Sequence, residues 1–341
     1  MKKYILLITL LSSIYGYSQF EQIFASEGDA QIFVSKYTEP VFGALLSATN
    51  ANWVTSARPA KPFHFELNIG VAGAFIPESK ESFTFNNSDY DYLRLDSGPN
   101  ELPTVVGGDS HSQLKIVIPI NNTEQKVMDF SAPSGLTQNL PQSAVPAPNI
   151  QLSMGLPLGF EVSARYLPKI ESNGGYIQIT GFGLKHSISQ YFKGKDDKGE
   201  KKKKTVINLA VQANYQMIST GYSFSGSNKA ATLDMNTISA RAIGSIDYKL
   251  LTIYGSTGYS KGDVKFNVNG TFDYTYDVQD NNGSHIRYET VSVDDPIKTK
   301  ASTDEMFFNA GVKLKLAFFQ IYADYTLQQY PVANVGIGFR F

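Results

Sequence analysis

Apolar and polar residues alternate along much of this chain, which is the pattern of β-strands with one apolar face and one polar face. Such faces suit a closed barrel whose outside meets lipid and whose inside is polar, because a closed sheet pairs every backbone group within a membrane. The pattern predicts an all-β protein, a transmembrane antiparallel β-barrel with an even number of strands, about 10–14. The clearest stretches are 63–75, 150–156, 160–166, 207–217, 238–248, 251–259, 305–316, 319–327 and 335–341, and weaker ones lie at 82–85, 90–95, 114–120, 263–276 and 286–293.

The final stretch places Val335, Ile337, Phe339 and Phe341 on one face. A chain end in water normally frays and carries polar residues, so four large apolar groups there need an apolar surrounding. This ending resembles the C-terminal strand of Gram-negative outer-membrane barrels, in which a terminal aromatic residue belongs to the assembly signal. The resemblance implies that the barrel-assembly machinery recognises these four residues and that lipid of the outer membrane surrounds the barrel.

Two stretches depart from regular alternation. In 176–188 the apolar residues change face near Gly181 and Gly183, so we expect a bulge or glycine kink there, since one extra residue moves every later side chain to the opposite face. The long segment 77–148 ends in a part rich in proline, and proline is excluded from central strands. We expect that part to be a loop, folded over or into the barrel. Its prolines are Pro133, Pro141, Pro146 and Pro148.

The chain begins with the features of an export signal. Two lysines precede an apolar run over 4–14, and small residues follow at Gly16 and Ser18. The run is too short to cross roughly 30 Å of hydrocarbon as a helix. We expect residues 1–18 to be a signal peptide that is cleaved near Ser18 and Gln19, which would send the mature protein to the bacterial outer membrane.

Residues 29–52 predict a helix, because apolar residues recur at spacings of three and four and Pro40 restarts a turn. A small amphipathic helix must cover its apolar face, either on the periplasmic mouth of the barrel or as a plug in the lumen. The expected units are therefore 1–18, the plug or periplasmic segment 19–61, and the barrel 62–341 with its long loop 77–148. The candidate plug residues are Phe33, Tyr37, Leu45 and Trp53.

Loop lengths predict the orientation of the barrel. The turns near 157, 250 and 317 are tight, whereas the alternate connections are longer, which matches the short periplasmic turns and long external loops of bacterial barrels. The C-terminus would then lie in the periplasm together with the N-terminal helix. The lysine-rich segment 193–204 is long although it lies on the short-turn side. We favour a solvated loop there over contact with anionic headgroups.

Charged residues on the inward faces of the strands have balanced signs, so we expect them to pair rather than to form a selective field. With about ten strands the lumen would be nearly filled, and with twelve or more a passage gated by the helix or the proline-rich loop would remain. The lumen-facing candidates are Glu66, Glu161, Arg165, Arg241, Asp247, Glu305, Lys313, Asp324 and Arg340.

Candidate chemistry is sparse. The chain has no cysteine, a formal net charge of −1 and four scattered histidines, which argues against thiol chemistry, nucleic-acid binding and a metal site. We expect no catalytic residue, no metal and no cofactor, so the protein is not predicted to be an enzyme. A rim hydrolase built on His186 with Ser187 or Ser189 is a weak alternative.

Four groups of residues mark the chain as a whole: Tyr37 with Pro40; Asn50, Ala51, Asn52 and Trp53 before Pro62 and Phe63; Gly155, Leu156 and Pro157 followed by Arg165, Tyr166 and Pro168; and Gly183, Leu184, Lys185 and His186. With these, the mature chain resembles a poorly characterised group of Gram-negative outer-membrane barrels that is distantly similar to the long-chain fatty-acid transporter superfamily. The resemblance implies an N-terminal segment at or inside the lumen and passage of a hydrophobic small molecule.

Two functions remain open from the sequence. The first is passive transport of a hydrophobic or small solute, which an apolar pocket near the plug or a lateral opening between strands would favour. The second is a non-transporting barrel that acts as a surface anchor or interaction protein through its external loops, which a lumen filled with ion pairs would favour.

Overall fold

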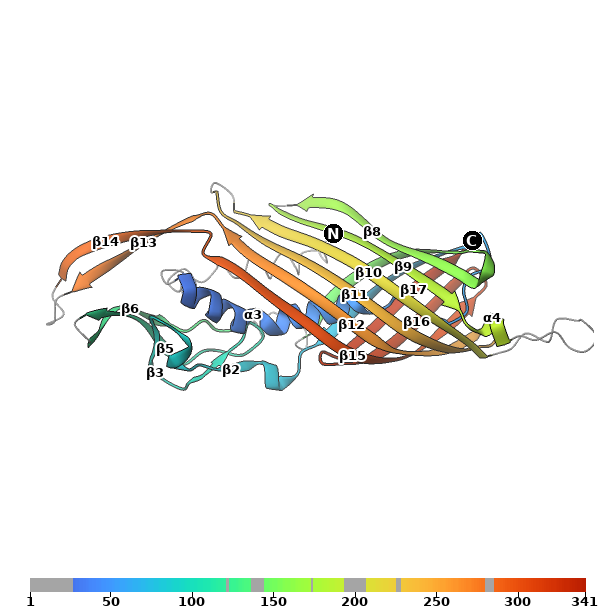
Figure 1. The fold of residues 1–341 in the computed structure, drawn as a ribbon, viewed down its shortest axis with the longest axis horizontal. Helices are drawn as coiled ribbons and strands as arrows, with labels where there is room; N and C mark the ends of the chain where they lie inside the picture. The colour runs from blue at the N-terminus through green and yellow to red at the C-terminus, as the bar shows by residue number, and fades with distance from the viewer. Residues whose placement is uncertain are drawn as a thin grey trace, which may run out of the picture.

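The body of the molecule is a closed antiparallel barrel of ten strands (Figure 1). The computed structural model describes residues 27–120, 123–135, 144–172, 174–192, 207–224, 228–279 and 285–341. The barrel confirms the predicted fold class and even strand number. Around the barrel the order is β1-β17-β16-β15-β12-β11-β10-β9-β8-β7, and β7 returns to β1. The strands are β1 (Phe65–Phe75), β7 (Ala144–Gly155), β8 (Phe160–Ser172), β9 (Gly175–Ser187), β10 (Ile207–Ser223), β11 (Ala230–Asp247), β12 (Leu251–Asn269), β15 (Ile297–Leu316), β16 (Phe319–Leu327) and β17 (Val332–Arg340).

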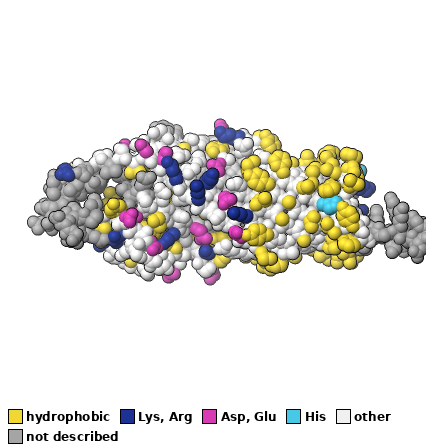
Figure 2. Space-filling model, in the orientation of Figure 1, with side chains coloured by type: hydrophobic (Ala, Val, Ile, Leu, Met, Phe, Trp, Pro, Cys, Tyr) yellow, Lys and Arg dark blue, Asp and Glu magenta, His cyan; other side chains and the backbone are white. Residues whose placement is uncertain are grey.

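Apolar side chains cover the outside of the barrel at the end that holds the C-terminus. On the face that Figure 2 shows, they cover this end as a band, whereas charged side chains gather on the other half of the molecule. The band arises from the period of two, since the exposed side chains alternate with buried polar ones along each strand. Its members include Ile69, Leu152, Phe182, Leu209, Ile253, Phe308, Ile321 and Val335.

Several strands extend beyond the length that a membrane requires. β10, β11, β12 and β15 contain 17–20 residues each, against the roughly nine to eleven of a tilted spanning strand. The barrel therefore continues past the apolar band on the side of the long connections. We call this side the long-loop end and the opposite side the short-turn end.

The remaining strands lie outside the barrel, at the long-loop end (Figure 1). Most of the weaker stretches of alternation thus form small sheets and a hairpin outside the barrel, whereas 263–269 extends barrel strand β12. A pair is formed by β2 (Ser82–Thr84) and β4 (Glu101–Pro103), a three-stranded sheet by β3 (Leu93–Ser97), β5 (Gln113–Ile120) and β6 (Thr123–Ser131), and a hairpin by β13 (Thr271–Gln279) and β14 (His285–Asp294). Short helical turns are Glu78–Lys80, Asn87–Asp89, Pro157–Gly159 and α4 (Ser189–Phe192).

The N-terminal helix, α3 (Glu27–Asn50), enters the lumen from the long-loop end. Near its start the Asp29 carboxylate accepts backbone N–H groups of residues 91–93 at 2.7–2.8 Å. From its end, residues 51–61 continue through the lumen to the short-turn end, where Phe63 donates its N–H to Gly155 at 2.8 Å. The structure thus has the plug arrangement, and the expectation that the helix sits beside the C-terminus is wrong, because residues 51–61 span the lumen between them.

Pro146 and Pro148 belong to barrel strand β7, so the expectation of a loop up to residue 148 is wrong at its end. Proline is tolerated in a strand where its nitrogen faces no pairing partner. The neighbouring strand β8 pairs with β7 only below this level, at 151–155. Proline is therefore excluded from fully paired strands, as expected, but β7 has an unpaired edge at this level. That edge exists only in the assembled barrel and cannot be read from the sequence.

No register shift occurs at Gly181 and Gly183, contrary to the expected bulge, because β9 pairs with β10 without interruption. The break in the pattern has another cause. Ile179 points into the lumen, where it is buried, whereas Phe182 points outward. The inward face of β9 therefore changes from small and polar residues to apolar ones along its length, without any change of face.

Within the described residues, no helix has the length and apolar character needed to cross a membrane. The expected signal peptide 1–18 and the lysine-rich segment 193–204 lie outside the described residues.

Candidate functional site

The lumen at the short-turn end is filled with ion pairs. Lys185 pairs with Glu161 at 2.6 Å, and Glu66 lies between Lys313 at 3.8 Å and Arg340 at 3.0 Å. A third group joins Lys315 to Asp247 at 3.3 Å. Glu66, Glu161, Lys185 and Lys313 are buried, and buried charges are tolerated only when they are paired and hydrogen-bonded. These pairs place charges of opposite sign side by side at the short-turn end.

The same charged groups hold residues 51–61 in place. The Glu161 carboxylate accepts the N–H of Ala60 at 2.8 Å, and Lys313 donates to the Thr55 hydroxyl at 2.9 Å. The hydroxyl of Ser56 donates to Asp247 at 3.1 Å. The plug segment and the barrel wall therefore form one polar network, which occupies the axial route.

Two arginines bind the end of α3. Arg165 on β8 donates to the carbonyls of Thr49 at 3.1 Å and Ala51 at 2.8 Å, and Arg241 on β11 donates to that of Asn50 at 3.0 Å. The last carbonyls of a helix have no partner within the helix and form the negative end of its dipole. The two guanidinium groups supply the missing donors. Arg165 and Arg241 thus bind the end of α3 from two strands, and we call this pair the arginine clamp.

Trp53 lies directly after the clamp and packs against it. The guanidinium carbon of Arg165 is 3.8 Å from the centroid of the Trp53 ring, a cation–π contact. Gly181 and Gly183 of β9 also approach the ring, and an added Cβ on them would come within 3.1 and 3.2 Å of ring atoms. These glycines therefore make room for the only tryptophan.

The other candidate residues take the following places. Asp324 is buried on β16 and accepts hydrogen bonds from Tyr254, Asn309 and Asn334 at 2.8–2.9 Å. Glu305 on β15 accepts one from Ser47 of α3 at 2.9 Å. All nine lumen-facing candidates thus point inward or to the inner rim, and all contact either the plug or another inward polar group. The plug candidates Phe33, Tyr37, Leu45 and Trp53 are buried, and the proposed assembly-signal residues Val335, Ile337, Phe339 and Phe341 lie on the outward face at the short-turn end.

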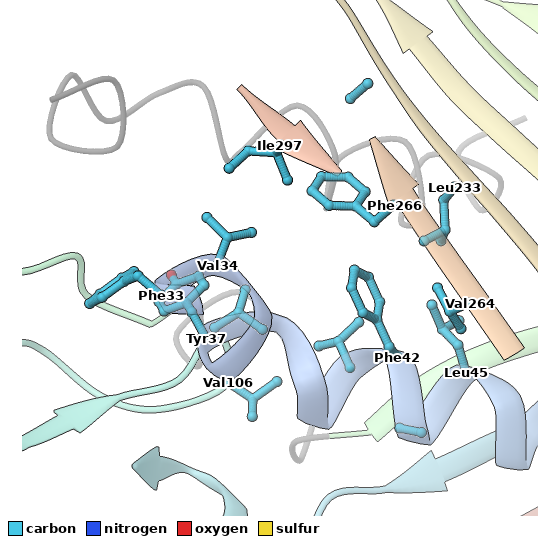
Figure 3. Close-up of a cluster of buried hydrophobic side chains, with 14 of the residues drawn as sticks. Phe33, Val34, Tyr37, Phe42, Leu45, Val106, Leu233, Val264, Phe266 and Ile297 are labelled. Atoms are coloured by element: carbon cyan, nitrogen blue, oxygen red, sulfur yellow. The ribbon is translucent and has the colours of Figure 1, made fainter. Parts of the chain in front are cut away.

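Above the clamp, toward the long-loop end, the lumen becomes apolar. Figure 3 shows Phe42 and Leu45 of α3 pointing toward Phe266 and Val264 of β12. The rings of Phe42 and Phe266 are 5.6 Å apart between centroids. Side chains of this kind each contribute roughly 1.5–3 kcal/mol when they are fully buried. Further inward apolar residues at this level are Ile179, Ile218, Leu233, Met235 and Ile297.

The barrel wall is incomplete at the same level. β7 pairs with β8 over five positions, from Gln151 with Arg165 to Gly155 with Glu161. By contrast, β7 pairs with its other neighbour β1 over eleven positions. Residues 144–150 of β7 and 166–172 of β8 therefore face each other without pairing. We call this stretch the seam.

Proline explains why the seam does not pair. Gly155 forms backbone hydrogen bonds with Phe63 and His64, directly before β1, so odd-numbered residues of β7 face β1 and even-numbered ones face β8. Pro146 and Pro148 occupy even positions and offer no N–H to β8. On the opposite edge, Pro168 lies where β8 loses its register with β9, between Leu167 and Ile170. Each edge of the seam thus lacks a donor at its proline positions.

Apolar side chains line the seam on the inside. Val145 is buried on β7, and Ala147 of β7 and Leu167 of β8 pack against the apolar cluster around α3. On the outer face, Ile150 and Tyr166 are exposed at the foot of the seam, at the edge of the apolar band. The seam was not predicted from the sequence, although three prolines beside two alternating stretches could have indicated strand edges that do not pair.

The weak hydrolase alternative finds no support in the geometry. His186 lies on the outer face of β9, and its Nε2 is within 2.9 Å of the Tyr191 hydroxyl and 3.2 Å of Gln190 Nε2. Ser189 instead bonds to the backbone of Leu209. Among the described residues, no group of three or more His, Cys, Asp or Glu side chains is arranged to hold a metal ion.

Comparison with solved structures finds outer-membrane β-barrels. The outer membrane protease OmpT from Escherichia coli shares 9% identity with a TM-score of 0.32, over 84% of this chain and 100% of that one. The toluene transporter TodX from P. putida shares 8% with a TM-score of 0.27, over 86% and 93%. Ail, the attachment invasion locus protein of Yersinia pestis, shares 11% with a TM-score of 0.24, over 82% and 100%.

No curated protein matches the chain in sequence. The structural likenesses are too distant to assign a function, and the barrel of this chain rests on its own strand pairing. The family match covers the full length, residues 1–341. This transmembrane β-barrel belongs to the family of unknown function DUF6588.

Proposed function

We propose that the barrel admits hydrophobic small molecules at its long-loop end and releases them sideways into the membrane through the seam. The observation that carries this proposal is the early end of pairing between β7 and β8, after Gln151 and Arg165. An unpaired stretch in a barrel wall exposes backbone groups and is costly in lipid. Here prolines remove three of the donors that the seam would otherwise leave unpaired.

The closed axial route supports a lateral path. Residues 51–61 and the ion pairs of Glu66, Glu161 and Asp247 fill the lumen below the clamp. A solute that enters from the long-loop end therefore meets the clamp and the plug before it reaches the short-turn end. The seam begins at the level of Arg165, just above this obstruction.

The lining supports an apolar solute. Val145, Ala147 and Leu167 border the seam inside, and Ile150 and Tyr166 lie at its outer foot. A hydrophobic molecule would pass between these side chains from an apolar interior to the edge of the lipid band. Such transfer is favourable by roughly 25 cal/mol for each Å² of apolar surface removed from water.

The test is to supply the missing donors. Replacing the three prolines by threonine (Pro146→Thr, Pro148→Thr, Pro168→Thr) lets the two edges pair, and each added hydrogen bond contributes roughly 0.5–1.5 kcal/mol. Cells that carry the wild type should transfer the fluorescent probe N-phenyl-1-naphthylamine into the outer membrane faster than cells without the protein. The triple variant should lose this acceleration.

The matched control is Pro77→Thr, which lies on the same side of the barrel but outside the seam. It should behave as the wild type. Folding of each variant is checked by its heat-modifiable mobility on gels. A triple variant that is folded and transfers the probe as fast as the wild type would overturn lateral uptake.

A second function is favoured by a separate observation, the filling of the lumen with ion pairs. In this alternative the barrel is an anchor, and the sheets β2–β6 and the hairpin β13–β14 at the long-loop end are its working part. The probe-transfer experiment distinguishes the anchor from lateral uptake. A wild type that does not accelerate probe transfer at all would favour the anchor.

A further inference from the structure

The arginine clamp carries more positive charge than its partners offset. All hydrogen bonds of Arg165 go to uncharged acceptors, namely two plug carbonyls and the amide oxygens of Gln151 and Gln216 at 3.1 and 2.9 Å. Arg241 likewise binds Asn50 and the hydroxyl of Ser239. Among the described residues, neither guanidinium forms an ion pair with a carboxylate.

The other basic groups of the lower lumen differ in this respect. Lys185, Lys313, Lys315 and Arg340 each lie within 4.0 Å of a carboxylate oxygen. Asp324 interacts electrostatically with Arg241 but forms no ion pair with it, and its own hydrogen bonds come from three neutral donors. The excess positive charge of the lumen is therefore concentrated at the clamp.

The end of α3 offsets only part of that charge. A helix C-terminus is equivalent to roughly half a negative charge, whereas the clamp carries two positive charges. Arg241 also retains a donor with no partner, its buried Nε. Two buried guanidinium groups with donors to spare have the chemistry of an anion-binding site.

We propose that Arg165 and Arg241 form a site for small inorganic anions, which the carbonyl end of α3 occupies in the closed barrel. When the helix leaves and draws residues 51–61 out of the lumen with it, an anion such as chloride or phosphate takes the place of the carbonyls. The lumen below is then an anion-selective path with the plug as its gate. This inference concerns the axial route and does not depend on lateral uptake through the seam.

The first test loosens the helix without adding charge. Phe42→Asn and Leu45→Asn together replace two side chains that seat α3 in the apolar lumen. In planar bilayers with a potassium chloride gradient, this variant should open channels in which chloride permeates roughly tenfold better than potassium. Adding Arg165→Gln and Arg241→Gln should abolish this preference. Replacing both by lysine should keep it, because the charge is retained.

Loosened channels that prefer potassium, or that keep their chloride preference without the arginines, would overturn the proposal. So would the absence of channels from a loosened variant that migrates as a folded barrel.

A second measurement follows the departure of α3 from the lumen without the loosening substitutions. Ser47 is buried against Glu305, and the chain has no cysteine. A thiol introduced by Ser47→Cys is therefore the only one present, and it can be labelled only when α3 leaves its place. Inorganic phosphate should speed maleimide labelling of this variant relative to HEPES at equal ionic strength, since phosphate competes with the carbonyls for the clamp. With both arginines replaced by glutamine, labelling should be fast and independent of phosphate. No phosphate effect in the parent would overturn the anion site.

Discussion

Gly43 of α3 faces the ring of Tyr330, and a Cβ on this glycine would lie 2.3 Å from a carbon of the ring. Tyr330 is fully buried in the turn between β16 and β17, and its hydroxyl donates to Glu39 at 3.2 Å. Glycine inside a helix costs roughly 0.8–1 kcal/mol relative to alanine. Its presence at this position is explained by the ring, which fixes the plug against the barrel wall.

Gly43→Ala should therefore destabilise the protein although it improves the helix. We expect a loss of roughly 1–3 kcal/mol from overpacking. In a Tyr330→Ala background the sign should reverse, because the added methyl then meets no ring and only the gain in helix propensity remains. Denaturant unfolding of the four proteins of this cycle measures the coupling. Equal effects of Gly43→Ala in both backgrounds would show that the ring does not control this position.

Asp29 connects the start of α3 to the sheets outside the barrel. Its carboxylate accepts the N–H groups of Asp91, Tyr92 and Leu93, and its side chain is buried. Asp29→Ala leaves these donors unpaired, at a cost of roughly 1–3 kcal/mol for each one that stays buried. We expect faster tryptic cleavage within 80–115, with the heat-modifiable barrel intact. Asp29→Asn keeps one acceptor oxygen and should be intermediate.

The exposed Asp109 offers a matched control, since Asp109→Ala removes a carboxylate from the same segment without touching α3. Its cleavage rate should equal that of the wild type. If Asp29→Ala is cleaved no faster than this control, the carboxylate does not hold the segment.

The start of α3 should lie on the cell surface, because the helix enters from the long-loop end and short turns face the periplasm in bacterial barrels. The chain has no cysteine, so a single introduced thiol can be followed cleanly. A membrane-impermeant maleimide should label Gly28→Cys in intact cells. It should label Leu158→Cys, in the turn Pro157–Gly159, only after the outer membrane is permeabilised. The reverse labelling would place the helix on the periplasmic side.

The faces of the strands could be predicted from the sequence, because a period of two assigns each side chain to one side without knowledge of the partner strands. This is why Glu66, Arg165 and Asp324 were identified as inward residues. The pairs that they form could not be predicted, since Glu66 meets Lys313 and Arg340 from strands more than 200 residues away.

Features set by the assembled barrel were missed for the same reason. Local sequence contains nothing about which mouth α3 enters, because that depends on the path of residues 51–61 through the lumen. At Ile177 and Ile179 the assumption of a uniformly polar interior was wrong, since the lumen becomes apolar above the clamp. Pro146 was assigned to a loop by a rule that is correct for central strands and does not apply along the seam.

A disulfide staple should distinguish the lateral route from the axial one. The hydroxyl oxygens of Ser56 in the plug segment and Ser245 on β11 are 3.4 Å apart, so sulfur atoms at these positions need only a small shift to reach the bond length of about 2.05 Å. Oxidised Ser56→Cys, Ser245→Cys fixes the plug segment to the wall below the clamp. Because the seam lies above the clamp, transfer of the hydrophobic probe should be unchanged.

The single variant Ser56→Cys, treated with the same oxidant, controls for loss of the hydroxyl that binds Asp247. Reduction of the double variant should also leave the transfer rate as it was. If oxidation instead slows the probe to the rate of the proline-to-threonine variant, the solute passes along the axis, and the plug segment rather than the seam controls its entry.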